Sequence, residues 1–542
     1  MNLAAPKVAR ATRPDGLTLD KASDLLRVFT LIACLGSLNG FSAVPLHDFQ
    51  AYLKASNTGA ADQFGVRVAI SGNTAVVSTR TEDSNATGVN GDAGNNGASN
   101  SGAVYVYAHD GTNWIQQAYL KASNTEANDQ FGYSVAISGD TIVVGADIEA
   151  SNATGIDGAQ DNNLAGISGA AYVFVRNGST WSQQAYLKAS NTDVNDAFGR
   201  AVAISGDTIV VGAPVEGSNA TGVNGDEVNN NANGSGAAYV FTRNGSTWTQ
   251  QAYLKASNTG VDDRFGHSVA IAGDSIVVGA YGEASNATGV SGNEDNNSAG
   301  VAGAAYVFFR DRSLWTQQAY LKAANTEAGD QFGELVAIDG DSVVIGARHE
   351  DSNANTINGN DADNSASSAG AAYVFFRNGS IWSQQAYLKA ANTAADDQFG
   401  FAVSISGDKV VVGAWFEDSD AIGVDGDPNN NNANDAGAAY VFKRTGSTWT
   451  QQSFLKASNT GVADLFGSSV ANSGETIIVG AHGEDSNAGG VNGDVLDNSF
   501  GDSGAAYVFA GTGPFVYPSA DVPKEVNDLV TVASSIALPP EA

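Results

Sequence analysis

The chain has 542 residues and a formal net charge of −32, although only 15% of its residues are charged. This charge argues against nucleic acid or an anionic membrane as a partner, because both repel an acidic protein. The single cysteine, Cys34, excludes a disulfide framework and any cysteine-based zinc site. The 64 glycines and the loops rich in Asn, Ser and Asp are typical of many short strands joined by turns.

Residues 1–43 differ from the rest and form a leader-like segment. Basic residues precede the apolar run 28–35, which is shorter than the roughly 20 residues that a membrane-spanning helix needs, so no transmembrane helix is expected. Three interpretations stay open: a secretory signal cleaved near Ser42 or Ala43, a lipoprotein signal in which segment 31–34 is the lipobox and Cys34 is lipidated, or a mere apolar leader. The first two predict export to the extracellular space or the outer surface.

The following segment, residues 44–512, is an internal repeat. A Phe-Gly pair recurs every 67 residues without an insertion, which defines seven copies of one structural unit. The phenylalanines are Phe64, Phe131, Phe198, Phe265, Phe332, Phe399 and Phe466. Residues 513–542 have no match to the repeat and are expected to form a flexible tail.

Each copy predicts four strands, as the second copy illustrates. Its first strand covers 131–138 and meets the second, 141–146, at the turn Ser138-Gly139-Asp140. A loop of 22 residues, 147–168, leads to a third strand at 169–174. Asn177-Gly178 is a hairpin signal, and the fourth strand covers 181–187.

These strands are apolar on both faces, which decides the fold class. In 171–174, small and branched side chains alternate with aromatic ones, whereas a half-exposed sheet alternates apolar with polar residues. Radial stacking of four-stranded antiparallel sheets buries both faces. The sequence therefore predicts an all-β protein, a seven-bladed β-propeller.

The ends of the array predict that the ring is closed by its N-terminal strand. The last copy lacks a fourth strand, while 49–54 supplies a spare one that matches 116–121. Pairing Tyr52 with the strand of Tyr507 would complete the seventh blade and remove exposed strand edges.

Three motifs resemble the FG-GAP repeat of integrin α-subunit propellers and related bacterial surface proteins. They are Phe-Gly at the start of the first strand, Val-Val-Gly-Ala at the end of the second and Ala-Tyr-Val-Phe in the third; only the third copy has the literal Gly212-Ala213-Pro214. The resemblance implies adhesion, ligand binding and calcium. However, the family's Asp-x-Asp-x-Asp-Gly calcium loop is missing between the first two strands.

A different set of carboxylates is the candidate metal site. Every copy has an Asp two residues before the Phe and a Glu eighteen residues after it, on loops that strand alternation places on one rim. These residues are Asp62, Glu82, Asp129, Glu149, Asp196, Glu216, Asp263, Glu283, Asp330, Glu350, Asp397, Glu417, Asp464 and Glu484. Calcium takes six to eight oxygens and is the candidate cofactor. In the alternative, Asp129 caps a turn and Glu149 forms an exposed ion pair with Lys121, worth about 0–1 kcal/mol.

Tryptophans are the candidate ligand contacts. Six recur in the fourth strand, where packing between blades competes with a carbohydrate-stacking ring. They are Trp114, Trp181, Trp248, Trp315, Trp382 and Trp449. Trp415 breaks the repeat at the acidic rim and is a better ligand-binding candidate.

The sequence favours a binding protein over an enzyme. It contains no Gly-x-Ser-x-Gly, His-Glu-x-x-His or phosphate-loop motif. We expect an exported adhesion propeller that recognises protein or glycan at a cell surface through its acidic loops, with calcium as a candidate cofactor. The alternative is a structural disc in an envelope or extracellular assembly, without a small ligand.

Overall fold

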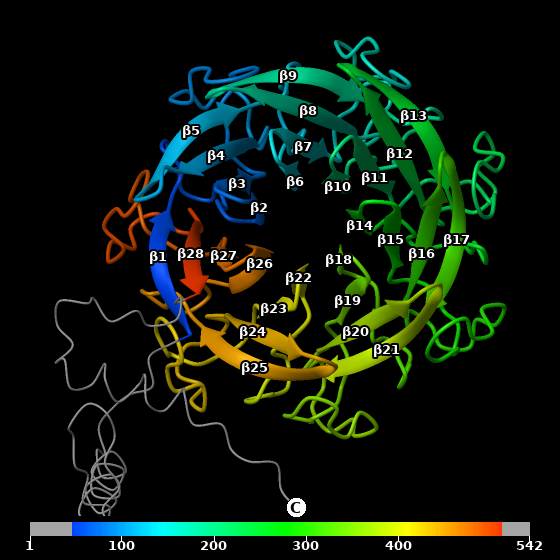
Figure 1. The fold of residues 1–542 in the computed structure, drawn as a ribbon. Helices are drawn as coiled ribbons and strands as arrows, with labels where there is room; N and C mark the ends of the chain where they lie inside the picture. The colour runs from blue at the N-terminus through cyan, green and yellow to red at the C-terminus, as the bar shows by residue number, and fades with distance from the viewer. Residues whose placement is uncertain (1–45, 512–542) are drawn as a thin grey trace, which may run out of the picture. The chain divides into compact units, whose positions relative to one another are not determined.

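The computed structural model describes residues 46–511, which form a ring of seven four-stranded antiparallel sheets (Figure 1). The leader 1–43, with Cys34, and the tail 513–542 lie outside the described residues. Among the residues described, no helix is long and apolar enough to cross a membrane.

The strands follow the chain from the inside of each blade to the outside. Blade one has β2 (Arg67–Ser71), β3 (Thr74–Thr79), β4 (Ala103–His109) and β5 (Trp114–Leu120). Blade two has β6 (Ser134–Ser138), β7 (Thr141–Ala146), β8 (Ala170–Asn177) and β9 (Thr180–Leu187). Blade three has β10 (Ala201–Ser205), β11 (Thr208–Ala213), β12 (Ala237–Asn244) and β13 (Thr247–Leu254). Blade four has β14 (Ser268–Ala272), β15 (Ser275–Ala280), β16 (Ala304–Asp311) and β17 (Leu314–Leu321).

The remaining blades repeat this order, except that the seventh borrows its outer strand. Blade five has β18 (Val336–Asp339), β19 (Ser342–Ala347), β20 (Ala371–Asn378) and β21 (Ile381–Leu388). Blade six has β22 (Ala402–Ser406), β23 (Lys409–Ala414), β24 (Ala438–Thr445) and β25 (Thr448–Leu455). Blade seven has β26 (Phe466–Ser473), β27 (Thr476–Ala481), β28 (Ala505–Gly511) and, from the other end of the chain, β1 (His47–Leu53).

The closing strand confirms the predicted circular arrangement. β1 pairs antiparallel with β28, with Tyr52 opposite Tyr507 and Leu53 opposite Ala506. Figure 1 shows the blue first strand lying beside the red last one. Both edges that an open array would expose are therefore hydrogen-bonded to each other.

The predicted first strand was too long at its start. β6 begins at Ser134, because Phe131 and Gly132 form a turn in which Tyr133 N–H donates to Gln130 O. The second strand was predicted correctly, and β8 extends three residues beyond the predicted end at Phe174.

The Phe-Gly turn fastens each blade to the preceding one. Gly199 has φ +91°, and a Cβ there would lie 2.2 Å from the carbonyl oxygen of Ala170. In the opposite direction, a Cβ on Gly145 of blade two would lie 2.0 Å from the oxygen of Gly199. Only glycine permits this backbone-to-backbone approach, which explains why both motifs recur in nearly every copy.

The core lies between blades rather than within them. Tyr172 and Phe174 pack in the cluster shared with blade one, whereas Ala171 and Val173 pack in the cluster shared with blade three. The alternation of small and aromatic residues in the third strand therefore buries both faces of every sheet.

Two rims result from the strand order, as predicted. We call the edge that carries the Phe-Gly turns, the long loops between second and third strands, and the segments after fourth strands the FG rim. The opposite rim carries the short turns, where Arg176 pairs with Asp140 at 2.6 Å. There, serine hydroxyls also accept backbone N–H groups of adjacent blades, as Ser71 does from Gly139.

Candidate functional site

The seven repeated glutamates of the FG rim form buried ion pairs with lysines. Each pair has an Nζ–Oε2 distance of 2.8–3.1 Å, with the lysine side chain 0% and the glutamate side chain 1–3% exposed. The pairs are Lys54–Glu484, Lys121–Glu82, Lys188–Glu149, Lys255–Glu216, Lys322–Glu283, Lys389–Glu350 and Lys456–Glu417.

Both glutamate oxygens are hydrogen-bonded, as blade two shows. Lys188 Nζ donates to Glu149 Oε2 at 2.9 Å and to Ser168 Oγ at 2.8 Å. Tyr186 OH and Asn124 Nδ2 donate to Glu149 Oε1 at 2.9 and 3.0 Å. Asn124 comes from the segment between blades one and two, so this network (the Lys–Glu network) also joins neighbouring blades.

The predicted pair between Glu149 and Lys121 was wrong in both partner and exposure. Lys121 belongs to blade one and pairs with Glu82, whereas Glu149 pairs with Lys188 at the end of its own outer strand. Burial arises because the long loop folds back along that strand, where Ile156 forms a β-bridge with Leu187. Side-chain spacing alone does not reveal this return of the loop.

The seven repeated aspartates cap turns, as the alternative interpretation predicted. Each accepts the backbone N–H of the residue three positions earlier at 2.6–3.0 Å. Asp129 is 6% exposed, and burial raises its pKa to about 7, with the nearby Glu149 charge adding to the rise. Burial therefore disfavours the ionised form of these carboxylates at neutral pH.

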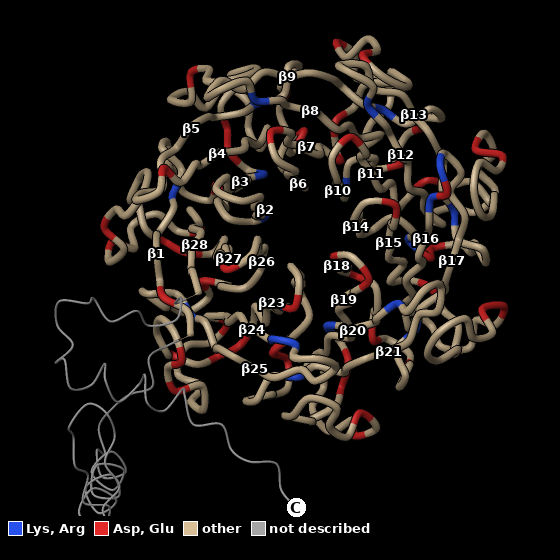
Figure 2. Tube along the Cα trace, in the orientation of Figure 1, with Lys and Arg blue, Asp and Glu red and all other residues tan. Residues whose placement is uncertain are grey.

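These contacts decide whether the repeated carboxylates are suited to bind calcium. A lysine ammonium already occupies the position that a cation would take beside each glutamate. Within residues 46–511, no group of three or more His, Cys, Asp or Glu side chains is arranged to hold a metal ion. Of the fourteen carboxylates, the seven glutamates are thus held in ion pairs and the seven aspartates cap turns. The prediction of calcium then depends on other carboxylates, and Figure 2 shows acidic residues in the peripheral loops.

The six tryptophans of the fourth strands pack between blades. They are 3–7% exposed. Trp248, for example, donates from Nε1 to Gln184 of the preceding blade at 2.9 Å, and the Arg243 guanidinium carbon lies 5.0 Å from its ring centre. These rings are not available as a carbohydrate-stacking surface.

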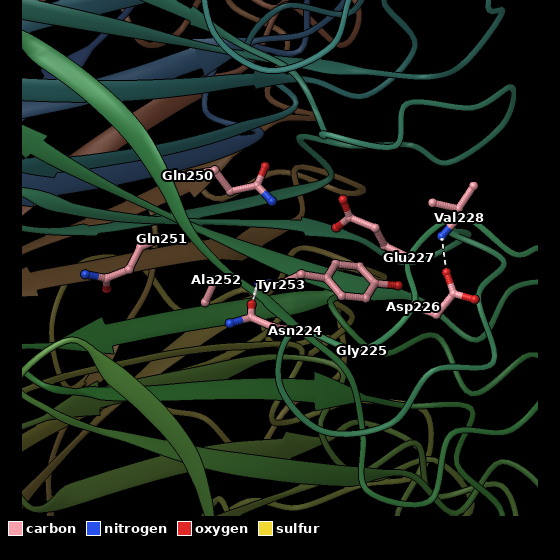
Figure 3. A pocket seen from close by; sticks show the side chains of 9 residues that line it. All are labelled: Asn224, Gly225, Asp226, Glu227, Val228, Gln250, Gln251, Ala252 and Tyr253. Carbon is pink, nitrogen blue, oxygen red and sulfur yellow. Dashed lines mark hydrogen bonds between the residues drawn. The ribbon is translucent and has the colours of Figure 1, made fainter.

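A hollow of about 480 Å³ lies between the long loop of blade three and β13 (Figure 3). Its wall includes the hydrogen bond from Tyr253 N–H to Asn224 Oδ1 at 2.9 Å. The same contact recurs in blade one between Tyr119 and Asn90. The hydrogen bond in the wall of this hollow is therefore part of the repeated framework.

The centre of the FG rim is different, because there the copies diverge. The second residue after each Phe lies just before the innermost strand, or within it in blade seven, and the sixteenth follows the second strand. Figure 1 shows the innermost strands around the axis. Together with Arg67 we call these residues the central cluster: Val66, Tyr133, Arg200, His267, Glu334, Phe401 and Ser468 at the first position, and Arg80, Asp147, Pro214, Tyr281, Arg348, Trp415 and His482 at the second.

One part of the central cluster gathers around Tyr133. The guanidinium carbons of Arg67, Arg80 and Arg200 lie 5.8, 5.9 and 4.3 Å from its ring centre. These arginines come from blades one and three and meet on a ring of blade two. Arg200 also pairs with Asp147 at 3.1 Å.

Another part is aromatic and contains Trp415. Its indole stacks on Phe401 at 4.0 Å and 9° between planes, and its ring lies 6.2 Å from His482 of blade seven. Arg348 joins this part, 5.5 Å from the Phe401 ring and 2.8 Å from Glu334. The structure thus places Trp415 within the cluster, where its role as a ligand contact stays a prediction.

Sequence reasoning missed the rest of the central cluster. The divergence after the Gly-Ala motif is visible in the sequence, because Asp147, Tyr281 and Trp415 occupy the same position in three different copies. From the sequence alone, this divergence indicates only a departure from the FG-GAP motif. Aligning the seven copies and noting which positions next to invariant residues vary most would have found the cluster.

Seven four-stranded blades closed into a ring by the first strand define a seven-bladed β-propeller. More narrowly, the chain belongs to the FG-GAP repeat family, which matches seven stretches and most of its length. The matched residues are 48–107, 114–174, 181–241, 248–308, 315–375, 382–442 and 449–509. Among curated proteins, none matches the chain significantly in sequence.

Proposed function

We propose that this FG-GAP propeller is an exported, non-enzymatic binding protein that recognises a protein or glycan on its FG rim, over the central cluster. Membership of the FG-GAP family supports a ligand-binding role outside the cell. The ligand contacts would come from the central cluster and the surrounding loops.

The divergence of the repeat at this one centre carries the proposal. A propeller that serves only as a disc gains nothing from seven different residues at a position next to an invariant Phe-Gly pair. A single ligand, in contrast, needs an asymmetric set of charged and aromatic groups, and Arg200, Glu334 and Phe401 provide such a set at equivalent positions.

The structural disc is the second candidate, and the Lys–Glu network favours it. Seven buried networks that link neighbouring blades account for the repeated carboxylates without any ligand. Calcium titration would distinguish in part between the binding protein and the structural disc. The remaining candidate calcium ligands are exposed carboxylates such as Asp420, Asp425 and Asp427. A bound ion would raise the melting temperature by mass action, whereas an inert disc would show no gain.

The proposal is tested by binding of the full chain to arrays of glycans and extracellular proteins. We expect a specific partner whose affinity falls at least tenfold in Trp415→Leu. Leu314→Ser is the matched control, because Leu314 is a large apolar residue that is 72% exposed on β17, away from the cluster. A partner that binds both variants as tightly as the wild type would contradict the proposed site.

A further inference from the structure

Two arginines of the central cluster have no carboxylate partner. Among residues 46–511, no Asp or Glu lies within ion-pair distance of Arg67 or Arg80. Arg67 donates to its neighbouring carbonyl, Val66 O, at 2.8 Å, and Arg80 donates from Nε to Gln63 Oε1 at 3.2 Å. Each guanidinium therefore keeps most of its five N–H donors for another acceptor.

The cluster as a whole is also short of negative charge. It contains four arginines, Arg67, Arg80, Arg200 and Arg348, against the carboxylates of Asp147 and Glu334. Both carboxylates already face an arginine, Asp147 with Arg200 and Glu334 with Arg348. An excess of two positive charges is thus concentrated at the centre of a chain whose net charge is −32.

The positive charge of the arginines contributes to lowering the pKa values of the two histidines of the cluster, His267 and His482. Burial, together with the charges of Arg200 and Arg67, lowers the pKa of His267 to about 3. Burial likewise lowers the pKa of His482 to about 4, with Arg80 and Arg67 adding to the effect. Arg67 thus acts on histidines of blades four and seven, and neither histidine adds charge at neutral pH.

Asp147 forms its ion pair with Arg200 rather than with Arg67 or Arg80, although its charge also acts on both of these arginines. Its Oδ2 accepts from Arg200, while its Oδ1 is buried without a hydrogen-bond partner among the described residues. Arg67 is partly buried, and burial lowers its pKa, as do the adjacent Arg200 and Arg80, while Tyr133 and Asp147 act in the opposite direction. Crowding like charges in this way costs free energy unless an anion joins them.

We infer that the central cluster binds an oxyanion, a carboxylate, sulfate or phosphate group, held between Arg67 and Arg80 beside Tyr133. Guanidinium groups bind such groups through paired N–H donors, and both arginines stand at the same ring, 5.8 and 5.9 Å from its centre. The inference deepens the proposed function, on which it rests, by naming the acidic group that the ligand presents to the FG rim.

The test is calorimetric titration of the full chain with sulfate, phosphate and malonate at pH 7 and constant ionic strength. We expect saturable binding of at least one anion, and the tightest identifies the acidic group. Arg67→Gln and Arg80→Gln should each weaken it at least tenfold. Lys443→Gln, which removes the same charge from an exposed residue of β24, should leave it within twofold.

Two results would overturn the inference: no saturable binding of any of the three anions to the wild type, or unchanged binding in both arginine variants. Melting curves of the variants test whether the fold is retained, and Arg67→Lys separates the effect of the charge from that of the paired donors. Because the anions are small probes, their titration does not depend on the array ligand. Failure of a saturating anion to compete with that ligand would overturn the assignment of this acidic group to the ligand, whereas the absence of any array ligand would count against the proposed function alone.

Discussion

The Lys–Glu network and the central cluster lie on the same rim of the propeller but use charge in opposite ways. In the network, every lysine meets a glutamate, and side chains of the same types recur in all seven blades. In the central cluster, seven different residues occupy one position, and Arg67 and Arg80 meet no carboxylate among residues 46–511. The network is closed within the protein, whereas the cluster has donors left over.

This difference shows how function can be located in a repeat protein. A contact that every blade needs is preserved in every copy, because each copy must bury the same surface against its neighbours. A ligand bound on the axis would contact each blade at one place and would require a different side chain from each. Repetition therefore marks the framework, and divergence beside invariant residues marks the candidate site.

The largest expected effect comes from breaking one buried pair. Lys188→Met should lower the free energy of unfolding by about 3–5 kcal/mol, because it leaves Glu149 buried without a counter-charge. Denaturant unfolding of the full chain measures this loss. Adding Glu149→Gln to the same chain should recover part of it, since the uncompensated charge is then gone. A single variant as stable as the wild type would show that the pair is not needed.

The sequence predicted the ring well, for a physical reason. Strand alternation and the spare segment around Tyr52 are local patterns, and seven copies repeat them, so fold class, blade number and closure were all predicted correctly. The start of the first strand was wrong because Phe131 is buried in a turn. Apolar periodicity does not separate a buried turn from a buried strand.

The candidate site was less predictable, because it depends on contacts between blades. Glu149 and Lys188 are 39 residues apart, and only the folded-back loop buries them together. Arg67 and Arg200 lie in different copies and meet at Tyr133 through the curvature of the ring. Sequence spacing gives the rim on which a residue lies, but it does not give the distance between residues of different blades.

The repeated aspartates offer the next largest effect, and it depends on pH. The folded-state pKa of Asp129 is about 7, above its ordinary value of 3.8, so its stabilising contribution is complete below about pH 4 and is lost as the pH rises through 7. Asp129→Asn keeps an oxygen for the Glu126 N–H and removes this dependence. Its stability relative to the wild type should therefore rise by about 2–4 kcal/mol between pH 4 and pH 8.

Denaturant unfolding at both pH values measures this change. Asp140→Asn is the control, because Asp140 is exposed on the opposite rim and pairs with Arg176. A constant difference between Asp129→Asn and the wild type across the pH range would mean that Asp129 is well solvated as an anion.

The smallest effect on stability is expected for the central cluster. It provides the sharpest test of the difference between this cluster and the Lys–Glu network. Arg67→Gln should change the free energy of unfolding by less than about 0.5 kcal/mol, because Arg67 has no ion pair within residues 46–511 to lose and stands among other arginines. Lys188→Met should show the reverse pattern, a large loss of stability with anion affinity unchanged in the folded fraction. If Arg67→Gln instead melted as early as Lys188→Met, Arg67 would belong to the framework, and divergence of the repeat would no longer indicate a binding site.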